Sequence, residues 1–441
     1  MYILYSALTL VVFVIASPWF VYQAIRYKKY VASLGQRMGY LPVSFNMDGD
    51  ASIWIHAVSV GEVLTARPLV TDLRRRYPDL RIFLSTTTIA GQQLARRSVP
   101  NVDAVFYFPF DLGIVVRRTL DLVRPRLFIM METEIWPVLL RECRQRGVTT
   151  AIVNGRLSSR SFPRYRFIRP FMRRVLQDID RFCVQSDESA RRFIELGADP
   201  GRVVVTGSLK FDSLEPATQS RNRERVLRYF RLPPARPVIV AGSTMKGEET
   251  AVLRAFRRIR ATSPSVLLVL APRHPERFDE VTDLCRSEGW KTLRRSRDLA
   301  IDAEPRADIV VLDTIGELAA VYQLGTVVFV GGSLVATGGH NVLEPAVYGK
   351  PIIFGPHMDN FREIADACVA AGAAVRLDDE SQLERTLIEL LGDPVRRARL
   401  GAAARALVEA NRGAKDKTIS ALESLMPVPP PSNVVPFRPI A

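Results

Sequence analysis

The chain has 441 residues, of which 47% are hydrophobic and 24% charged, and 61 Lys and Arg against 46 Asp and Glu give a formal net charge of +15. At roughly 100–200 residues per domain, this length suffices for two or three domains with sizeable cores. The composition excludes a disordered chain, a disulfide scaffold and a collagen-like repeat, and only one stretch is apolar enough to span a bilayer. The positive surplus favours a phosphate-rich partner, either nucleic acid or an anionic membrane surface.

The first stretch of the chain predicts a membrane anchor. No charged residue occurs from residue 2 to residue 25, and about 20 apolar residues suffice to cross a bilayer. A cleaved signal peptide would begin with basic residues, whereas here the first positive charges, Arg26 and Lys28, come after the apolar run. We therefore predict a single anchor helix over 1–27 and a basic linker over 28–50. The positive-inside rule then places the rest on the cytoplasmic side of the inner membrane. Pro18 leaves open a helix that lies in the membrane plane.

After this linker, β-branched apolar runs alternate with amphipathic stretches. Such alternation predicts parallel sheets covered by helices on both faces. We predict one Rossmann-like domain over 51–212, a linker over 213–236, a second Rossmann-like domain over 237–425 and a Pro-rich tail over 426–441. Two such domains facing a central cleft would bind ligands at the carboxyl ends of their strands. The predicted strands are 52–57, 82–86, 104–108, 127–130, 149–153, 182–184, 203–206, 238–241, 266–271, 309–312, 327–330 and 352–354.

Two acidic signals follow predicted strands of the first domain. In WIHAVSVGEV, residues 54–63, Glu62 opens a helix. It either stabilises the helix N-terminus or serves as a general base. In IMMETEIWP, residues 129–137, Glu132 follows a buried strand directly. It either caps the next helix or acts at a reacting centre.

The most basic segment of the chain covers residues 141–174, which contain ten Arg and one acidic residue. Arg side chains bind phosphates bidentately, and the aromatic residues interleaved here suit a lipid headgroup layer. A nucleic-acid surface and a merely solvated face would give the same pattern. Because of the anchor we favour a phosphorylated lipid, with Arg156 and Arg160 as phosphate-binding residues, and expect no nucleic acid partner.

Cationic and glycine-rich segments end several later strands. Lys210 in VTGSLKFD and Arg273 in LVLAPRHPERF are cations suited to a phosphate-bearing leaving group. In GGSLVATGGHNVLEPA, residues 331–346, paired glycines precede a predicted helix near Asn341, an arrangement that offers backbone N–H groups to an anion. Glu344, one turn later, could accept hydrogen bonds from ribose hydroxyls. The dispersed cysteines and histidines predict no zinc site.

Taken together, these segments resemble the 3-deoxy-D-manno-octulosonic acid (Kdo) transferase family of lipid A biosynthesis. The resemblance rests on WIHAVSVGEV, ETEIWP, NGRLSSRS, TGSLKFD, APRHPERF and GGSLVATGGHNVLEPA, in that order. It implies a GT-B fold and an inverting transfer of Kdo from CMP-Kdo to lipid IVA. A UDP-sugar enzyme such as a lipid A disaccharide synthase is the alternative, and a membrane-tethered nucleic-acid binder fits the charge but not the glycine turns.

The resemblance also implies a role for each matching residue. Glu62 matches the proton acceptor, and Glu132 and Lys210 match residues that stabilise the transition state. The implied CMP-binding residues are Pro272, Arg273, Ile315, Gly316, Glu317, Asn341, Val342, Leu343 and Glu344. Since cations and backbone amides would stabilise the departing phosphate, we expect no metal cofactor.

Overall fold

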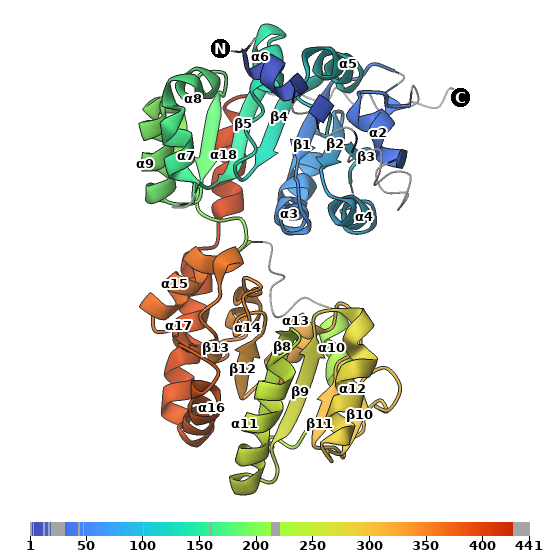
Figure 1. Ribbon diagram of the computed structural model, residues 1–441, viewed down its shortest axis with the longest axis vertical. Helices are drawn as coiled ribbons and strands as arrows, with labels where there is room; N and C mark the ends of the chain where they lie inside the picture. Colours follow the sequence, from blue (N-terminus) through green and yellow to red (C-terminus); the bar gives the residue numbers. More distant parts are fainter. Residues whose placement is uncertain are drawn as a thin grey trace, which may run out of the picture. The chain divides into compact units, whose positions relative to one another are not determined.

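The structure is a computed structural model that describes residues 2, 4–11, 14–15, 18, 31–42, 45–46, 48–99, 101–158, 161–212 and 221–426. The chain divides into two compact units. Residues 1–213 and 412–441 form the first, and residues 214–411 form the second. Each unit is built around its own seven-stranded parallel sheet (Figure 1).

The sheet of the first unit has the strand order β3-β2-β1-β4-β5-β6-β7. Its central strands are buried along their length, which is why they are continuous apolar runs rather than alternating ones. The order reverses between β1 and β4, so this pair forms the topological switch point. The strands are β1 (Ser52–His56), β2 (Arg81–Thr86), β3 (Ala104–Tyr107), β4 (Pro125–Met131), β5 (Thr149–Gly155), β6 (Arg181–Val184) and β7 (Val203–Val205).

Helices cover both faces of this sheet (Figure 1). They are α2 (Val31–Arg37), α3 (Val60–Arg76), α4 (Ile89–Ser98), α5 (Gly113–Val123), α6 (Pro137–Gln145), α7 (Phe162–Phe167), α8 (Arg169–Leu176), α9 (Asp187–Leu196) and α18 (Ala414–Glu423).

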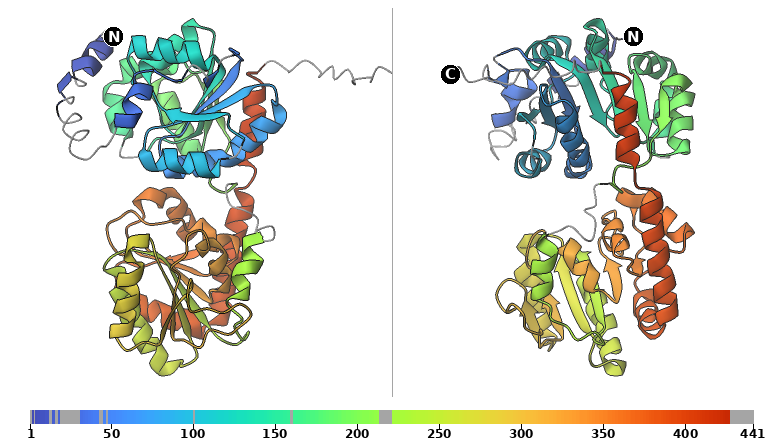
Figure 2. Two further views of the ribbon diagram at one scale, coloured as in Figure 1. Left: turned by 90° about the vertical axis from the view of Figure 1, so that its right-hand side faces the viewer. Right: turned by 180° about the vertical axis from the view of Figure 1, so that it is seen from behind.

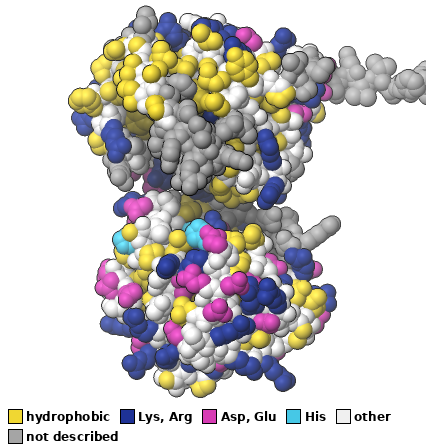
Figure 3. All heavy atoms as spheres, turned by 45° about the vertical axis from the view of Figure 1, so that its right-hand side comes forward, with side chains coloured by type: hydrophobic (Ala, Val, Ile, Leu, Met, Phe, Trp, Pro, Cys, Tyr) yellow, Lys and Arg dark blue, Asp and Glu magenta, His cyan; other side chains and the backbone are white. Residues whose placement is uncertain are grey.

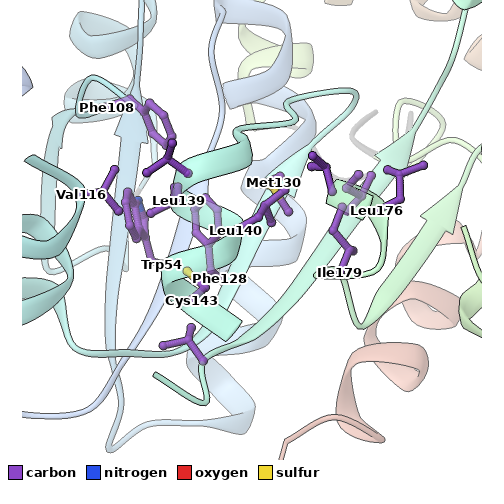
Figure 4. Close-up of a cluster of buried hydrophobic side chains, with 14 of the residues drawn as sticks. Trp54, Phe108, Val116, Phe128, Met130, Leu139, Leu140, Cys143, Leu176 and Ile179 are labelled. Atoms are coloured by element: carbon purple, nitrogen blue, oxygen red, sulfur yellow. The ribbon is translucent and has the colours of Figure 1, made fainter. Parts of the chain in front are cut away.

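Side chains alternate between two cores, one on each face of the sheet. Trp54, Phe128 and Met130 belong to one cluster, shown in Figure 4, whereas Ile53 and Ile129 belong to the other. This alternation is the two-residue period of a strand, so a register slip of one residue would exchange the two cores. Trp54 is fully buried, and its indole N–H donates to Ser85 Oγ at 2.7 Å.

The second unit has the strand order β10-β11-β9-β8-β12-β13-β14, with its switch point between β8 and β12. The strands are β8 (Val238–Thr244), β9 (Leu267–Pro272), β10 (Thr292–Arg294), β11 (Ile309–Val311), β12 (Val327–Val330), β13 (Ile352–Phe354) and β14 (Ala374–Arg376). The helices are α10 (Arg221–Arg228), α11 (Glu248–Thr262), α12 (Phe278–Ser287), α13 (Leu318–Val321), α14 (Leu343–Val347), α15 (Arg362–Ala370), α16 (Gln382–Gly392) and α17 (Pro394–Ala410).

The prediction of two parallel-sheet, Rossmann-like bodies is confirmed, and a strand occurs at each predicted position. Strands β10 and β14 were not among the predicted strands. Both are three-residue strands at the ends of the second sheet, too short to give a recognisable apolar run.

The predicted domain boundaries are wrong at two places. Helix α18, assigned to the second domain as part of 237–425, packs on the first unit, where Ile419 and Leu422 join the core beside α3 (Figure 2). Its sequence says only that it is amphipathic and not which sheet it covers. The predicted linker 213–236 contains helix α10, which packs against α13 of the second unit. Apart from Met426, which is buried, the predicted tail 426–441 lies outside the described residues.

The described part of the N-terminal segment lies against the first unit. Residues 4–11 are helical, the Tyr2 hydroxyl donates to Asp178 at 2.7 Å and the Tyr5 hydroxyl donates to Asp111 at 3.0 Å. Among the described residues, no helix combines the length and the apolarity needed to cross a membrane. Residues 19–30 of the predicted anchor and linker lie outside the described part, whereas residues 31–37 of the predicted linker form helix α2.

Candidate functional site

The two acidic signals of the first unit meet at its switch point. Glu62 lies in the first turn of α3, after β1, and Glu132 directly follows β4. Strands β1 and β4 are parallel neighbours, so their carboxyl ends bring these two segments to one edge of the sheet. Glu62 and Glu132, which the sequence analysis identified separately, therefore lie at the same edge of the folded sheet.

The carboxylate of Glu62 is held by its own turn. Ser59 caps α3, and its hydroxyl donates to Glu62 Oε1 at 3.1 Å, while the backbone N–H of Val58 donates to Oε2 at 2.8 Å. Of the two interpretations of the sequence, these contacts bear out the one in which Glu62 stabilises the start of α3, and its role as a general base stays a prediction.

The surroundings of Glu62 disfavour its charge. Burial, the nearby charge of Glu132 and, to a smaller extent, that of Glu134 raise the pKa of Glu62 to about 7, against the two hydrogen bonds that lower it. Burial and then Glu132 likewise raise the pKa of Glu134 to about 7, against the opposing effect of Trp136. A carboxylate with a pKa near neutrality can accept a proton and release it again at physiological pH.

Glu132 occupies a strained backbone position beside a cation. Its φ of 57° is in the left-handed region, which non-glycine residues seldom adopt, and its N–H donates to Val153 O at 2.9 Å. Lys210 Nζ lies 3.5 Å from Glu132 Oε1. The structure therefore brings together all three residues for which the resemblance implies catalytic roles.

Asn154, at the carboxyl end of β5, orders the segment that carries Lys210. It is fully buried and also has a left-handed φ of 58°, which Asn tolerates better than most residues. Its side-chain oxygen accepts the N–H of Leu209 at 3.0 Å. Lys210 is thereby tied through its neighbour to the strand next to β4.

A buried histidine lies beside Glu134. His56 Nδ1 is 3.1 Å from the carbonyl oxygen of Ser85, and the ring stacks on Phe108 with centroids 3.8 Å apart. Burial lowers the pKa of His56 to about 3, so the ring is neutral. Nδ1 also lies 3.0 Å from the hydroxyl oxygen of Ser85, and Nε2 lies 3.9 Å from Glu134 Oε2.

The basic segment reaches this edge of the sheet through Arg156, which is half-buried. The Thr133 hydroxyl, between Glu132 and Glu134, donates to the backbone oxygen of Arg156. Arg160, the other predicted phosphate-binding residue, lies outside the described residues. Among the residues that are described, no group of three or more His, Cys, Asp or Glu side chains is placed to hold a metal ion.

In the second unit, Pro272 ends β9 and Arg273 follows it as an exposed side chain. Asn341 Nδ2 lies 3.4 Å from Glu344 Oε1, while Val342 and Leu343 are buried in the same segment. Burial raises the pKa of Glu344 to about 7, against opposing effects of Asn341 and Arg273. The predicted residues from these two distant segments therefore lie within electrostatic reach of one another.

The third predicted donor segment differs from the other two in its exposure. The Ile315 side chain is 83% exposed and Gly316 has a φ of 85°, whereas Glu317 is only 5% exposed. Glu317 accepts from Arg295 Nη2 at 2.9 Å and from Thr314 Oγ1 at 2.7 Å. The carboxylate of Glu317 thus holds the turn of residues 315–317 together. The turn exposes the Ile315 side chain and the backbone of Gly316 to solvent.

The turn that contains the first glycine pair, residues 331–334, is called the glycine turn below. The prediction that it offers its N–H groups to a bound anion is wrong. The N–H groups of Gly332, Ser333 and Leu334 all donate to Glu248, a buried carboxylate at the start of α11. The helix expected near Asn341 begins at Leu343 and has only five residues.

His56, Asn154 and Glu248 were missed as functional candidates. For Glu248 one signal was available, because the sequence Gly247-Glu248 after β8 repeats the Gly61-Glu62 arrangement after β1. Nothing in the sequence indicates the partners of His56 or Asn154, because each contact depends on the neighbouring strand.

Sequence comparisons identify relatives along nearly the whole chain. Residues 32–213 match the family model described as 3-deoxy-D-manno-octulosonic-acid transferase (kdotransferase), and residues 243–407 match glycosyl transferases group 1. The chain is 34% identical over 407 residues to a 3-deoxy-D-manno-octulosonic acid transferase of Haemophilus influenzae, covering 91% of this chain and 93% of that protein. It is 36% identical over 381 residues to the protein of that name from Bordetella pertussis, covering 85% of this chain and 87% of that one.

Among solved structures, the chain resembles MurG of Acinetobacter baumannii with a TM-score of 0.52 and 11% identity, over 85% of this chain and 99% of MurG. At this identity the likeness concerns the fold alone. Together with the two parallel sheets, it supports a GT-B architecture of two Rossmann-like domains.

Proposed function

Because the chain belongs to the 3-deoxy-D-manno-octulosonic acid transferase family, we propose that it transfers Kdo from CMP-Kdo to lipid IVA in lipopolysaccharide core biosynthesis. The reaction is a glycosyl transfer with inversion at the anomeric carbon of Kdo. The UDP-sugar alternative is not favoured. The two relatives reported above are both named Kdo transferases, and the match to this chain covers 93% and 87% of their lengths.

The observation that carries this proposal is the position of Glu62 among Glu132, Glu134 and Lys210 at the switch point of the first unit. A hydroxyl of the acceptor sugar attacks the anomeric carbon, its O–H bond breaks, and Glu62 accepts the proton. The bond from that carbon to the phosphate oxygen breaks, and its electron pair leaves with CMP. With its pKa near 7, Glu62 is a stronger base than an exposed glutamate and is still ionised in part at neutral pH.

Glu132 and Lys210 are assigned to transition-state stabilisation. Positive charge develops on the sugar ring, which a carboxylate favours, and negative charge develops on the leaving phosphate, which an ammonium group favours. Lys210 Nζ lies 3.5 Å from Glu132 Oε1, so the ammonium group and the carboxylate are already side by side before substrate binds.

The second unit is assigned to the donor. We propose that Pro272, Arg273, the turn of residues 315–317 and the segment of residues 341–344 bind CMP. Arg273 supplies a permanent positive charge for the phosphate. With cations available, the reaction should proceed without a metal cofactor, and the rate should survive treatment with EDTA.

We assign the lipid acceptor and the membrane surface to the first unit. The described residues of its N-terminal segment expose Leu4, Leu8, Val14 and Ile15, and Phe167 of α7 is 89% exposed. Hydrophobic side chains also gather on the face of the first unit seen in Figure 3. With Arg156 and Arg160 on the basic segment, this composition suits an anionic phospholipid surface.

The contacts of Tyr2 and Tyr5 favour an in-plane anchor over a spanning one. Both hydroxyls bond to aspartates of the first unit. A helix that crosses about 30 Å of hydrocarbon would separate them from a body on the cytoplasmic side. Flotation with anionic vesicles should therefore decrease when Leu8 and Ile15 are replaced by glutamate, and unchanged flotation would argue against this anchor.

The test of the proposed function is direct. The purified chain is incubated with lipid IVA and freshly generated CMP-Kdo, and the lipid product is analysed by mass spectrometry. A mass increase by one or more Kdo residues is expected, and its size also gives the number of sugars added. Product formed from a UDP-sugar, with none from CMP-Kdo, would overturn the proposal.

A further inference from the structure

The carboxylate of Glu248 lies inside a cage of backbone N–H groups. Its Oε2 accepts from Met245 at 2.9 Å and from Gly332 at 2.7 Å. Its Oε1 accepts from Ser333 and from Leu334, both at 2.9 Å. One donor belongs to the turn between β8 and α11, and the other three belong to the glycine turn that follows β12. The side chain therefore joins the two strands of the switch point.

This hydrogen-bond pattern requires the ionised carboxylate. A carboxylate has about four lone-pair positions, and four donors occupy them here. A protonated carboxyl group would direct its own hydrogen at one of these N–H groups. Glu248 is 1% exposed, so bulk solvent does not replace a missing partner. It thus occupies the place that a bound anion would take in a glycine-rich turn.

The glycine turn also orders the loop that follows it. The carbonyl of Gly332 accepts the N–H of Gly339 at 2.7 Å and the hydroxyl of Thr337 at 2.9 Å. A Cβ on Gly332 would lie 2.8 Å from the His340 ring, so this ring packs directly on the glycine backbone. His340 immediately precedes the segment of residues 341–344 assigned to the donor.

The His340 ring is itself a candidate for ligand contact. Its Nε2 is buried without a hydrogen-bond partner among the described residues. Burial, followed by the charges of Arg273 and His274, lowers the pKa of His340 to about 4, so the ring is neutral near a cation that would bind phosphate. Any change in the glycine turn would move this ring relative to Arg273.

We propose that Glu248 is a positioning residue for donor binding, whose ionised carboxylate holds residues 332–334 in the conformation that places His340 and the segment of residues 341–344. This inference rests on the proposed function and extends it, because no donor-binding role follows for Glu248 from the family motifs. It also means that side chains, rather than the N–H groups of residues 332–334, contact the donor phosphate.

The test compares Glu248→Gln with a control at the opposite edge of the same sheet. An amide accepts at only one of its two heavy atoms, so at least one N–H of the cage loses its acceptor. We expect the Kd for CMP and the KM for CMP-Kdo to rise about tenfold or more, while kcat at saturating donor falls less than threefold. Faster amide hydrogen exchange is expected in residues 331–341.

Asp308→Asn supplies the control. Asp308 precedes β11, is half-buried, and accepts from the N–H of Lys291 at 3.1 Å and from Arg260. Its replacement should lower thermal stability without changing CMP affinity. If Glu248→Gln lowered stability as Asp308→Asn does and left CMP affinity unchanged, Glu248 would be a structural residue only and the inference would be overturned.

Two further arms keep the test decisive. If Glu248→Gln does not fold, Glu248→Asp takes its place, since it keeps the charge and shortens the reach, and an unchanged Kd for CMP would again overturn the inference. If the wild-type chain binds UDP and not CMP, the proposed donor is wrong, and the same variants are compared for UDP. Wild-type protein that binds neither nucleotide would refute both proposals.

Discussion

Two glutamates occupy the same place in the two units of this molecule. Glu62 follows Gly61 after β1, and Glu248 follows Gly247 after β8. Each lies in the first turn of a helix next to a switch point, and each is buried, with 8% and 1% of its surface exposed. Sequence and topology thus assign the same description to both.

Their partners are opposite in kind. Glu62 accepts from one backbone N–H and one hydroxyl of its own turn and faces two further carboxylates. Glu248 accepts four N–H groups, three of them from another strand connection. Burial raises the pKa of both side chains, yet only Glu248 has donors for every lone pair. A buried carboxylate therefore indicates chemistry when its charge is left partly unsatisfied, and architecture when it is fully satisfied.

The largest effect that would distinguish the two glutamates is expected from Glu62→Gln. A general base contributes about 10²–10⁴-fold to a rate, so we expect kcat to fall about 1,000-fold because the amide cannot accept the proton. CMP affinity should stay within about twofold, in contrast to Glu248→Gln. Steady-state kinetics and calorimetric titration with CMP measure both quantities. Near-normal turnover would show that Glu62 is not the base. Glu423→Gln, which changes an exposed side chain of α18, is the matched control.

The next largest effect is expected from Lys210→Met. Removing an ammonium that stabilises developing charge should lower kcat about 100-fold, with a smaller change in the KM for either substrate. The substitution also leaves Glu132 without its cation at 3.5 Å. Lys417→Met on α18, which removes a positive charge elsewhere in the first unit, should keep full activity. Equal activities of the two variants would contradict the assignment.

Two glycine substitutions, one beside each glutamate, should differ in their effect on the free energy of unfolding. A Cβ on Gly331 would lie 2.6 Å from Ser243 O and 2.9 Å from Glu248 Oε2, whereas a Cβ on Gly61 meets only Ser59 Oγ at 3.9 Å. We expect Gly331→Ala to lower the free energy of unfolding by about 1–3 kcal/mol, the usual cost of overpacking. Gly61→Ala should be neutral or slightly stabilising. Urea denaturation measures both, and equal effects would show that the cage is not rigid.

The smallest expected effect concerns the pH dependence of kcat, which reports on the ionisation of Glu62. Because the base must be ionised, kcat should decrease as the pH falls through about 7, the pKa of Glu62. Glu134→Gln removes a like charge, so the pKa of Glu62 should fall and the acid limb should move to lower pH by less than one unit. A pH–rate profile of both proteins provides the measurement. An upward shift would mean that Glu134 does not repel Glu62.

Much of the fold and part of the site were predictable because both follow local rules. Apolar β-branched runs located the strands, and parallel strands present their carboxyl ends at one edge. For this reason Glu62 and Glu132, 70 positions apart in the chain, could be expected to lie together. The roles implied by the resemblance required motif knowledge in addition, since the spacing alone left helix capping as an equal explanation for Glu62.

The remaining features depend on contacts between distant segments. Glu248 and Glu249 are adjacent and both are buried, yet one binds the glycine turn more than 80 residues away and the other pairs with Arg277. Amphipathic periodicity gives the apolar face of α18 but not the sheet it will cover. Such choices are made by tertiary packing, which a single sequence does not display.

The return of α18 to the first unit has a consequence for protein synthesis. Residues 214–411 form the second unit from one continuous stretch of chain, whereas the first unit needs Ile419 and Leu422 to complete its core. Asp212 binds the N–H groups of Gly413 and Lys415 at 2.8 and 2.7 Å, which ties the outgoing and incoming segments together. On the ribosome, the second unit can therefore complete its packing before the first, and a nascent chain that stops before residue 412 leaves the core of the first unit without Ile419 and Leu422.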